Sequence, residues 1–137
     1  MRLQLTKRAD YGIRAMLALA RARDERMSAP RIAAAMRIPR HFLPQVMADL
    51  ARAGLVKSTA GRHGGYRLAR RADGISLLEV VEAVEGDGGQ IDCVLSDAPC
   101  GRDGRCELHE FFADARQALL ARLAAASLAD VPPVALG

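Results

Sequence analysis

The residues with the most distinctive chemistry are three cysteines and one histidine. Cys93, Cys100 and Cys106 are all the cysteines of the chain and follow the spacing C-x6-C-x5-C, and His109 stands three residues after the last. The proline and glycines between them favour a loop that turns the thiols inward around one centre. Three thiolates and an imidazole form a complete ligand set for a zinc ion or an iron–sulfur cluster. The segment therefore predicts a metal or cluster site.

Other roles for these thiols are less well supported. A disulfide scaffold is disfavoured because the number of cysteines is odd and because we expect no secretory signal peptide. In a reducing cytoplasm, which we expect to be the location of the chain, clustered cysteines are more often metal ligands or redox sensors. Three unrelated buried thiols would not be expected to fall within so short a segment. A reduced thiol switch without metal is a weaker alternative.

The charge of the chain is divided between its two halves. Residues 1–72 hold sixteen Lys/Arg and four Asp/Glu, a net charge of +12, whereas residues 73–137 hold four and twelve, a net charge of −8. This division favours a first half that meets a polyanion and a second half with another task. A chain of 137 residues is expected to form one domain, or a small domain with an appended element, and no apolar run is long enough to cross a membrane.

The basic half has the pattern of a helix-turn-helix. Thr6 is expected to cap a helix that ends near Ala22, Ser28 to cap a short second helix, and residues 39–53 to form a third. Two short helices joined by a tight turn place the second one in the major groove of DNA. Pro44 lies about one and a half turns inside the expected third helix, where it removes a hydrogen bond and bends the helix.

A hairpin is expected behind the third helix. Residues 55–60 and 66–69 read as strands, and the turn between them is rich in glycine. This hairpin is interpreted as a wing, with Arg62 and His63 at its tip, near the minor groove or the phosphates. A nucleotide-binding loop is disfavoured, because the GxGxxG spacing is absent and no helix with Lys-Ser/Thr follows.

The side chains expected to read DNA bases lie in the first half of the third helix. They are Arg40, His41 and Gln45, and glutamine is a natural bidentate partner of adenine. An enzyme is disfavoured, because the histidines other than His109 sit in DNA-facing elements and no catalytic triad or carboxylate pair stands out.

The acidic half predicts two further helices. Ser76 and Glu79 form a capping box that opens a helix ending near Glu85. A long helix over residues 107–126 has an apolar stripe, which we expect to pair with a second copy of the chain rather than to fold back on the first helix. The stripe consists of Leu108, Phe111, Phe112, Ala115, Leu119 and Leu123. The expected division is a DNA-binding domain over 1–72, a connecting helix and cysteine loop over 73–106, a dimerisation helix over 107–130 and a tail over 131–137.

Several segments together resemble one family, the IscR- and NsrR-like Rrf2 family of winged-helix transcription regulators. They are MRL at 1–3, LTKRADYGIRAM at 5–16, FLPQ at 42–45, AGLV at 53–56, GGYRLA at 64–69 and the cysteine loop with the helix after it. The resemblance implies a mainly α fold with a small β-hairpin wing, a winged helix-turn-helix followed by a long dimerisation helix. It also implies a homodimeric repressor of palindromic double-stranded DNA, with an iron–sulfur cluster that controls binding. Gly64, Gly65 and Tyr66 are then wing residues at the DNA.

The resemblance offers two candidates for the fourth cluster ligand. Asp10 stands where NsrR-like proteins supply a carboxylate to a [4Fe–4S] cluster, the type that we favour. His109 stands where IscR-like proteins complete a [2Fe–2S] site. The implied signal is nitric oxide, oxygen or redox state, or the supply of iron–sulfur clusters. The sequence departs from the family pattern at Ala60 and His63 beside the wing, and in the longer first cysteine spacing.

A structural zinc site is the alternative to a sensing cluster. Tetrahedral zinc accepts three cysteines and a histidine at close to this spacing. The chain would then bind nucleic acid without sensing anything.

Overall fold

The computed structural model describes residues 4–86 and 106–133. In this part of the chain five α-helices accompany a two-stranded antiparallel hairpin, and this confirms the expected fold class. The helices are α1 Lys7–Ala22, α2 Ala29–Met36, α3 Leu43–Arg52, α4 Leu77–Glu85 and α5 His109–Ala125, and the strands are β1 Val56–Thr59 and β2 Gly65–Leu68. Three single-turn 3-10 helices, η1 Arg40–Phe42, η2 Ala72–Gly74 and η3 Leu128–Asp130, lie between or after them.

Hydroxyl side chains start three of the helices, as the sequence predicts. Thr6 accepts the N–H of Ala9 at 3.1 Å at the start of α1, and Ser28 accepts from Arg31 at 3.3 Å at the start of α2. Ser76 opens α4 in a full capping box with Glu79. Each cap satisfies a backbone donor that the first turn of a helix leaves without a partner.

The third helix differs from the expected single helix over 39–53. A 3-10 turn over residues 40–42 comes first, and the α-helix begins only at Leu43. Pro44 therefore lies at the start of α3, where its missing N–H has no intrahelical partner to lose and its fixed φ suits the helix. The reason to expect a bend at Pro44 is thus removed, because the α-helix starts later than the apolar spacing indicates.

Helix α1 is the centre of the core. Its buried Met16 and Leu19 pack with apolar side chains from the elements around it. Gly12 allows α4 to come close, since a Cβ at this position would lie 3.2 Å from a methyl group of Val84. The other large, fully buried side chains are Ile32, Leu43, Val46, Met47, Leu50, Leu55, Ile75 and Val80. The basic half and α4 therefore share one core.

The hairpin is anchored to the helix-turn-helix. The strands pair from Val56 opposite Leu68 to Thr59 opposite Gly65. The backbone of Tyr66 also exchanges two hydrogen bonds, of 2.8 and 2.9 Å, with Met27, just before α2. Three segments thus meet at Tyr66, so the hairpin and α2 are joined by backbone bonds.

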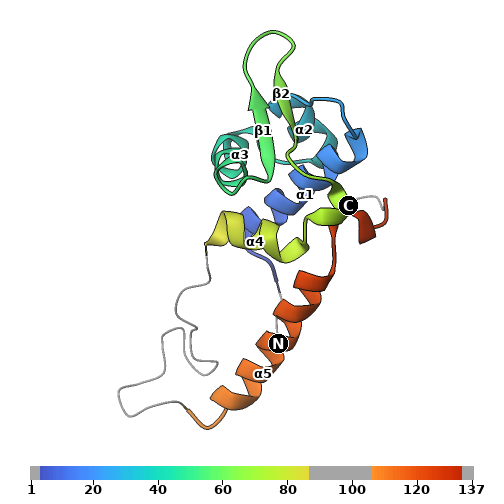
Figure 1. Cartoon of the computed structure of the whole chain (residues 1–137). Helices are drawn as coiled ribbons and strands as arrows, with labels where there is room; N and C mark the ends of the chain where they lie inside the picture. The colour runs from blue at the N-terminus through green and yellow to red at the C-terminus, as the bar shows by residue number, and fades with distance from the viewer. Residues whose placement is uncertain (1–3, 87–105, 134–137) are drawn as a thin grey trace.

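Helix α5 leaves this domain, and its last turn is joined to it by backbone hydrogen bonds. Its first turn lies far from the domain, and its last turn returns to it (Figure 1). Ala126 accepts the N–H of Leu77 at 2.9 Å, Leu128 donates to Ile75 at 3.0 Å, and the Leu128 side chain is buried. The helix ends at Ala125, and the residues just after it belong to the core of the domain.

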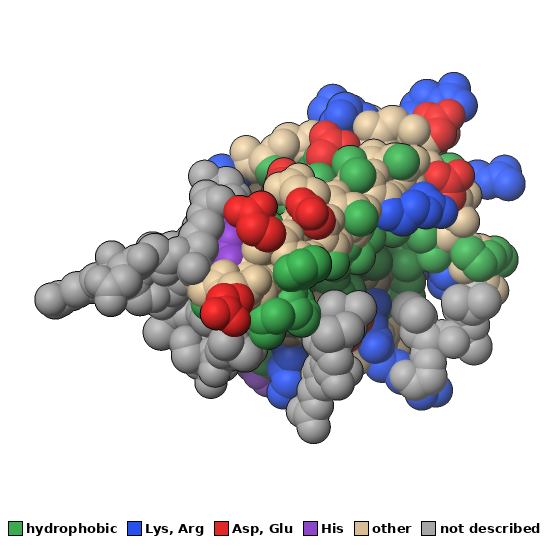
Figure 2. Space-filling model, turned by 90° about the horizontal axis from the view of Figure 1, so that it is seen from below, with side chains coloured by type: hydrophobic (Ala, Val, Ile, Leu, Met, Phe, Trp, Pro, Cys, Tyr) green, Lys and Arg blue, Asp and Glu red, His purple; other side chains and the backbone are tan. Residues whose placement is uncertain are grey.

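The sides of α5 are unequally covered. None of its side chains is fully buried in the single chain. A half-buried row follows the helical repeat at Ala113, Arg116, Leu120 and Leu123. A second side exposes large apolar groups, which are Phe111 at 73%, Leu119 at 46%, Phe112 at 40% and, just before the helix, Leu108 at 38% exposure. The predicted stripe is thus divided, since Leu123 belongs to the half-buried row. Seen from below, apolar and acidic side chains lie side by side on the surface (Figure 2).

Candidate nucleic-acid interface

The turn that leads into α3 presents the first expected DNA-reading residues. Arg40 and His41 are exposed in the 3-10 turn. Behind them the ring of Phe42 lies 4.5 Å from the ring of His41 and 5.0 Å from the ring of Tyr11 on α1, centroid to centroid. Aromatic contacts at this separation are favourable, so they fix the direction in which the turn points.

Gln45 is exposed on the first turn of α3 and has a partner within the protein. Its Nε2 donates to Oδ1 of Asp49 at 3.1 Å, one helical turn further on. Asp49 is 6% exposed, the one buried charged residue in the described part of the chain. It also forms ion pairs with Arg52, at 3.1 Å, and with Arg8 of α1. The amide of the expected base-reading residue is thus held by a buried carboxylate.

Sequence reasoning missed Asp49 and Arg8 at this site. The spacing of Gln45, Asp49 and Arg52 places them on one side of a helix and was available as a signal. The pairing of Arg8 with Asp49 spans 41 residues and depends on how α1 packs against α3. No periodicity reports such a contact.

The hairpin tip exposes Arg62 and His63, as expected. The two glycines after them have a structural reason to be glycine. A Cβ at Gly64 would lie 2.1 Å from the carbonyl oxygen of Thr59, and one at Gly65, where φ is +144°, would lie 2.7 Å from that of Met27. These glycines let the hairpin close and approach the segment before α2.

Two cations face each other across the hairpin. Lys57 on β1 is paired in register with Arg67 on β2, and both side chains are exposed. Like charges directly opposite each other destabilise a hairpin. An anion lying against this pair would offset that repulsion, as a DNA phosphate does.

The candidate cluster ligands are described only in part. Cys93 and Cys100 lie outside the described residues. Cys106 is half-buried just before α5, and its carbonyl accepts the N–H of His109 at 3.0 Å, so the two are one turn apart. Within residues 4–86 and 106–133 no three His, Cys, Asp or Glu side chains gather as a metal site.

Asp10, the other candidate ligand, lies on α1 and forms an ion pair. Its carboxylate accepts from Nε of Arg14 at 2.8 Å, and the side chain of Asp10 is 40% exposed. Arg14 also donates to the carbonyl of Met36 at 3.3 Å, at the end of α2. Asp10 is therefore linked through one guanidinium to the turn of the helix-turn-helix.

The start of α1 is tied to the end of α4 near these residues. The hydroxyl of Thr6 donates to the carboxylate of Glu85. Glu85 is the last residue of α4. Thr6 therefore caps its own helix and contacts the element that leads toward the cysteine segment.

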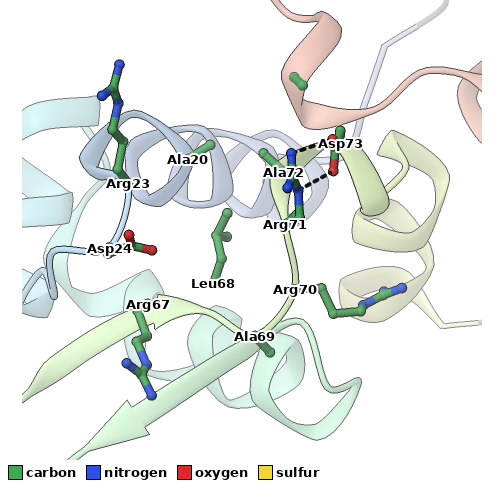
Figure 3. Close-up of a pocket in the computed structure, with 11 residues that line it drawn as sticks. Ala20, Arg23, Asp24, Arg67, Leu68, Ala69, Arg70, Arg71, Ala72 and Asp73 are labelled. Atoms are coloured by element: carbon green, nitrogen blue, oxygen red, sulfur yellow. Dashed lines mark hydrogen bonds and ion pairs between the residues drawn. The ribbon is translucent and has the colours of Figure 1, made fainter.

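A cavity of about 680 Å³ beside β2 is lined by several arginines (Figure 3). Arg70 and Arg71 are paired with Glu79 and Asp73, at 2.6 and 3.1 Å. The side chains of Arg23, Arg67 and Arg70 point in different directions (Figure 3). An anion site needs convergent donors, so this cavity is a poorer candidate than the surface around α3.

Glu79, at the start of α4, is more acidic than a free carboxyl group. The hydrogen bond from Arg70, followed by that from the backbone of Ser76, lowers the pKa of Glu79 below its usual range. The shift belongs to the capping of α4 and does not involve the side chains that are expected to read DNA. No helix of the described ranges is long and apolar enough to cross a bilayer.

Comparison with known proteins identifies the family. The Rrf2 family model, described as "Iron-dependent Transcriptional regulator", matches residues 5–132. Protein aau3 of Rhizobium meliloti is 39% identical over 121 residues, which cover 80% of this chain and 77% of that protein. The transcriptional repressor NsrR of Streptomyces coelicolor is 30% identical and the match covers 98% and 95%.

Solved structures agree with this result. CymR, the global cysteine regulator of B. subtilis, superposes with a TM-score of 0.79 at 27% identity and covers 94% of this chain and 95% of its own. IscR of T. potens gives a TM-score of 0.74 at 27% identity, with 93% and 85% covered. The family model, NsrR and CymR are all named as regulators or repressors. The chain therefore belongs to the Rrf2 family of winged-helix, DNA-binding transcription regulators.

Proposed function

We propose that this chain is a cytoplasmic, homodimeric repressor whose iron–sulfur cluster senses nitric oxide, oxygen or redox state, or the supply of clusters. The observation that carries the DNA-binding part is the exposed group Arg40, His41 and Gln45 at the start of α3, beside a hairpin tipped by Arg62. Side chains in the first turns of a recognition helix reach base edges, and the wing reaches phosphate or the minor groove.

The residues of this interface have distinct tasks. Gln45 is the base reader, because an amide matches the donor and acceptor that adenine presents in the major groove. The DNA phosphates are contacted by Arg62, Lys57 and Arg67. Cations at the phosphates replace condensed counterions and raise the affinity for DNA of any sequence. His63, Gly64, Gly65 and Tyr66 complete the wing contacts, and the two glycines also shape the hairpin.

The donor set suits an iron–sulfur cluster. Soft thiolates are the preferred ligands of such irons, and the described Cys106 and His109 lie one turn apart at the start of α5. Cys93, Cys100 and Cys106 would hold the group, with Asp10 or His109 as the fourth ligand, in a [4Fe–4S] or a [2Fe–2S] cluster respectively. A bound cluster supplies a centre that reacts with nitric oxide or oxygen.

The two candidate fourth ligands imply different routes to the DNA. If Asp10 were a cluster ligand, its carboxylate would leave Arg14, and the anchor that Arg14 provides at the end of α2 would change. If His109 were the ligand, it would link the site to α5 and so to the pairing of subunits. We favour Asp10, because its partner already contacts the helix-turn-helix.

Separate Asp10→Ala and His109→Ala variants decide between these routes. Anaerobic absorption spectra and the rate of reaction with nitric oxide are the measurements. We expect Asp10→Ala to alter both and His109→Ala to leave them close to wild type. The reverse result would assign the fourth ligand to His109.

The exposed apolar side of α5 supports a homodimer. Phe111, Phe112 and Leu119 extend into solvent in the single chain. A two-fold pair of such helices buries these groups and matches a palindromic operator, because each subunit then meets one half-site.

Two measurements test the proposed function. Protein purified without oxygen should be brown and contain iron and sulfide, whereas a colourless zinc protein would support the structural zinc alternative. In DNA binding, Gln45→Ala should cost about 1–3 kcal/mol on the selected operator and relax one base position. Gln117→Ala, on the exposed surface of α5, is the matched control and should bind as wild type.

A further inference from the structure

We infer that Asp49 is a specificity-determining positioning residue: it fixes the amide of Gln45 in the orientation that accepts adenine and rejects guanine. The inference rests on the proposed function, because it takes α3 as the element that reads bases. Asp49 touches no DNA in this role and acts through Gln45.

The contacts around Asp49 leave little freedom to its carboxylate. One oxygen accepts from Arg8 of α1, and the other accepts from Arg52 and from Nε2 of Gln45, both at 3.1 Å. The side chain of Asp49 is 7% exposed, whereas that of Arg52 is 73% exposed. In the described part of the chain no buried side-chain polar atom lacks a partner. The network therefore anchors Gln45 to α1 as well as to its own helix.

The orientation of the amide follows from the chemistry of the two groups. A carboxylate in ion pairs only accepts hydrogen bonds, so the end of the amide that faces it must be the NH₂ end. One N–H of Gln45 is then used within the protein. Its carbonyl oxygen and its second N–H remain for the DNA.

The carbonyl oxygen and the one N–H of Gln45 that remain distinguish adenine from guanine. Adenine presents an acceptor, N7, beside a donor, the N6 amino group, and one N–H with one carbonyl oxygen satisfies both. Guanine presents two acceptors, N7 and O6, and a glutamine with only one available N–H leaves O6 without a donor. An amide that is not held can offer both N–H groups to guanine. Asp49 thus raises the preference for adenine.

The test is base preference at single positions. Wild-type protein selects its site from a randomised pool of double-stranded DNA, and each position of that site is then changed in turn. A bidentate contact corresponds to a base preference of about 5- to 150-fold. Asp49→Asn, which keeps the shape but no longer excludes the flipped amide, should lower the adenine-over-guanine preference at one position by at least about threefold. Asp114→Asn, the same change at an exposed position of α5, is the matched control and should keep the preference.

A double variant separates positioning from a general structural role. In a Gln45→Ala background, Asp49→Asn should have no further effect on base preference, whatever it does to stability. A loss of preference of equal size with and without Gln45 overturns the inference. If Gln45→Ala changes one base position and Asp49→Asn changes none, the inference fails while the proposed function stands. If wild type selects no site at all, the proposed function itself fails.

A measurement on the wild-type protein covers the case in which Asp49→Asn does not fold. The two Nε2 protons of Gln45 can be followed by NMR without DNA. One of them should exchange with solvent at least about tenfold more slowly than the side-chain amide protons of Gln4, which is exposed. Equal exchange at both positions overturns the inference.

Discussion

The apolar side of α5 offers the sharpest test of how the protein assembles. Phe111 is 73% exposed in the single chain. An aromatic side chain presents about 150–250 Å², so about 150 Å² of this ring is available to a partner, worth about 4 kcal/mol at 25 cal/mol per Å². A two-fold dimer buries two such rings, and Phe111→Ala should therefore weaken it by about 8 kcal/mol, or between five and six powers of ten in the dissociation constant.

Sedimentation equilibrium over a wide range of concentrations measures this constant. Wild type should remain dimeric at micromolar concentration and Phe111→Ala should dissociate, with the helical signal in circular dichroism retained. Gln117→Ala is the control, since Gln117 is also exposed on α5 but lies about 120° from Phe111 around the helix axis. If Phe111→Ala dimerises as tightly as this control, the exposed side of α5 is not the interface and the area argument is refuted.

Three further predictions concern the wing, the hairpin and the start of α4. Arg62→Ala should weaken binding to all DNA sequences alike and reduce the slope of log affinity against log salt by about 1, measured in a salt titration, and an unchanged slope would remove the tip from the phosphates. Gly65→Ala should cost more than about 2 kcal/mol in urea unfolding, because φ is +144° and the added Cβ would lie 2.7 Å from a backbone carbonyl. Gly74→Ala, which has open space at its Cβ, should cost little, and similar costs at the two sites would contradict the steric argument. The pKa of Glu79 is lowered mainly by Arg70, so its contribution to stability is present above the ordinary value of 4.5 and is lost as pH falls through the lower folded-state pKa. Acid unfolding followed by circular dichroism should therefore show a smaller loss of stability for Glu79→Gln over that range, and an equal loss would contradict the assignment.

Local rules were sufficient for most of the fold. Hydroxyl caps at Thr6, Ser28 and Ser76 can be read from a few neighbouring residues, because the hydrogen bonds that they accept are local. The start of α3 could not be predicted from such local rules. Apolar spacing continues through the 3-10 turn at Arg40–Phe42, so it does not show that the α-helix begins at Leu43.

The sequence predicted only those residues of the candidate site whose exposure follows from local structure. Arg62 and His63 lie at a turn between two strands, and this was enough to place them at the tip. The anchoring of Gln45 depends on an aspartate that meets an arginine from another helix, and such a contact follows from tertiary packing. Sequence patterns thus indicate which side chains are exposed at the candidate interface better than they indicate what holds them.

The β-bridge between Ser76 and Ser127 fixes the end of α5 to the domain. This bridge is the pivot about which α5 can tilt as a rigid helix. The two segments around these residues exchange backbone hydrogen bonds, so the last turn of α5 moves with α4. The 17 residues of α5 extend for about 25 Å at 1.5 Å per residue. A tilt of about 5° at the pivot then displaces the first turn, next to Cys106, by about 2 Å, given the same rise per residue. A displacement of the first turn near Cys106 therefore corresponds to only a small rotation at the domain, and a small rotation of the domain gives a larger displacement near Cys106.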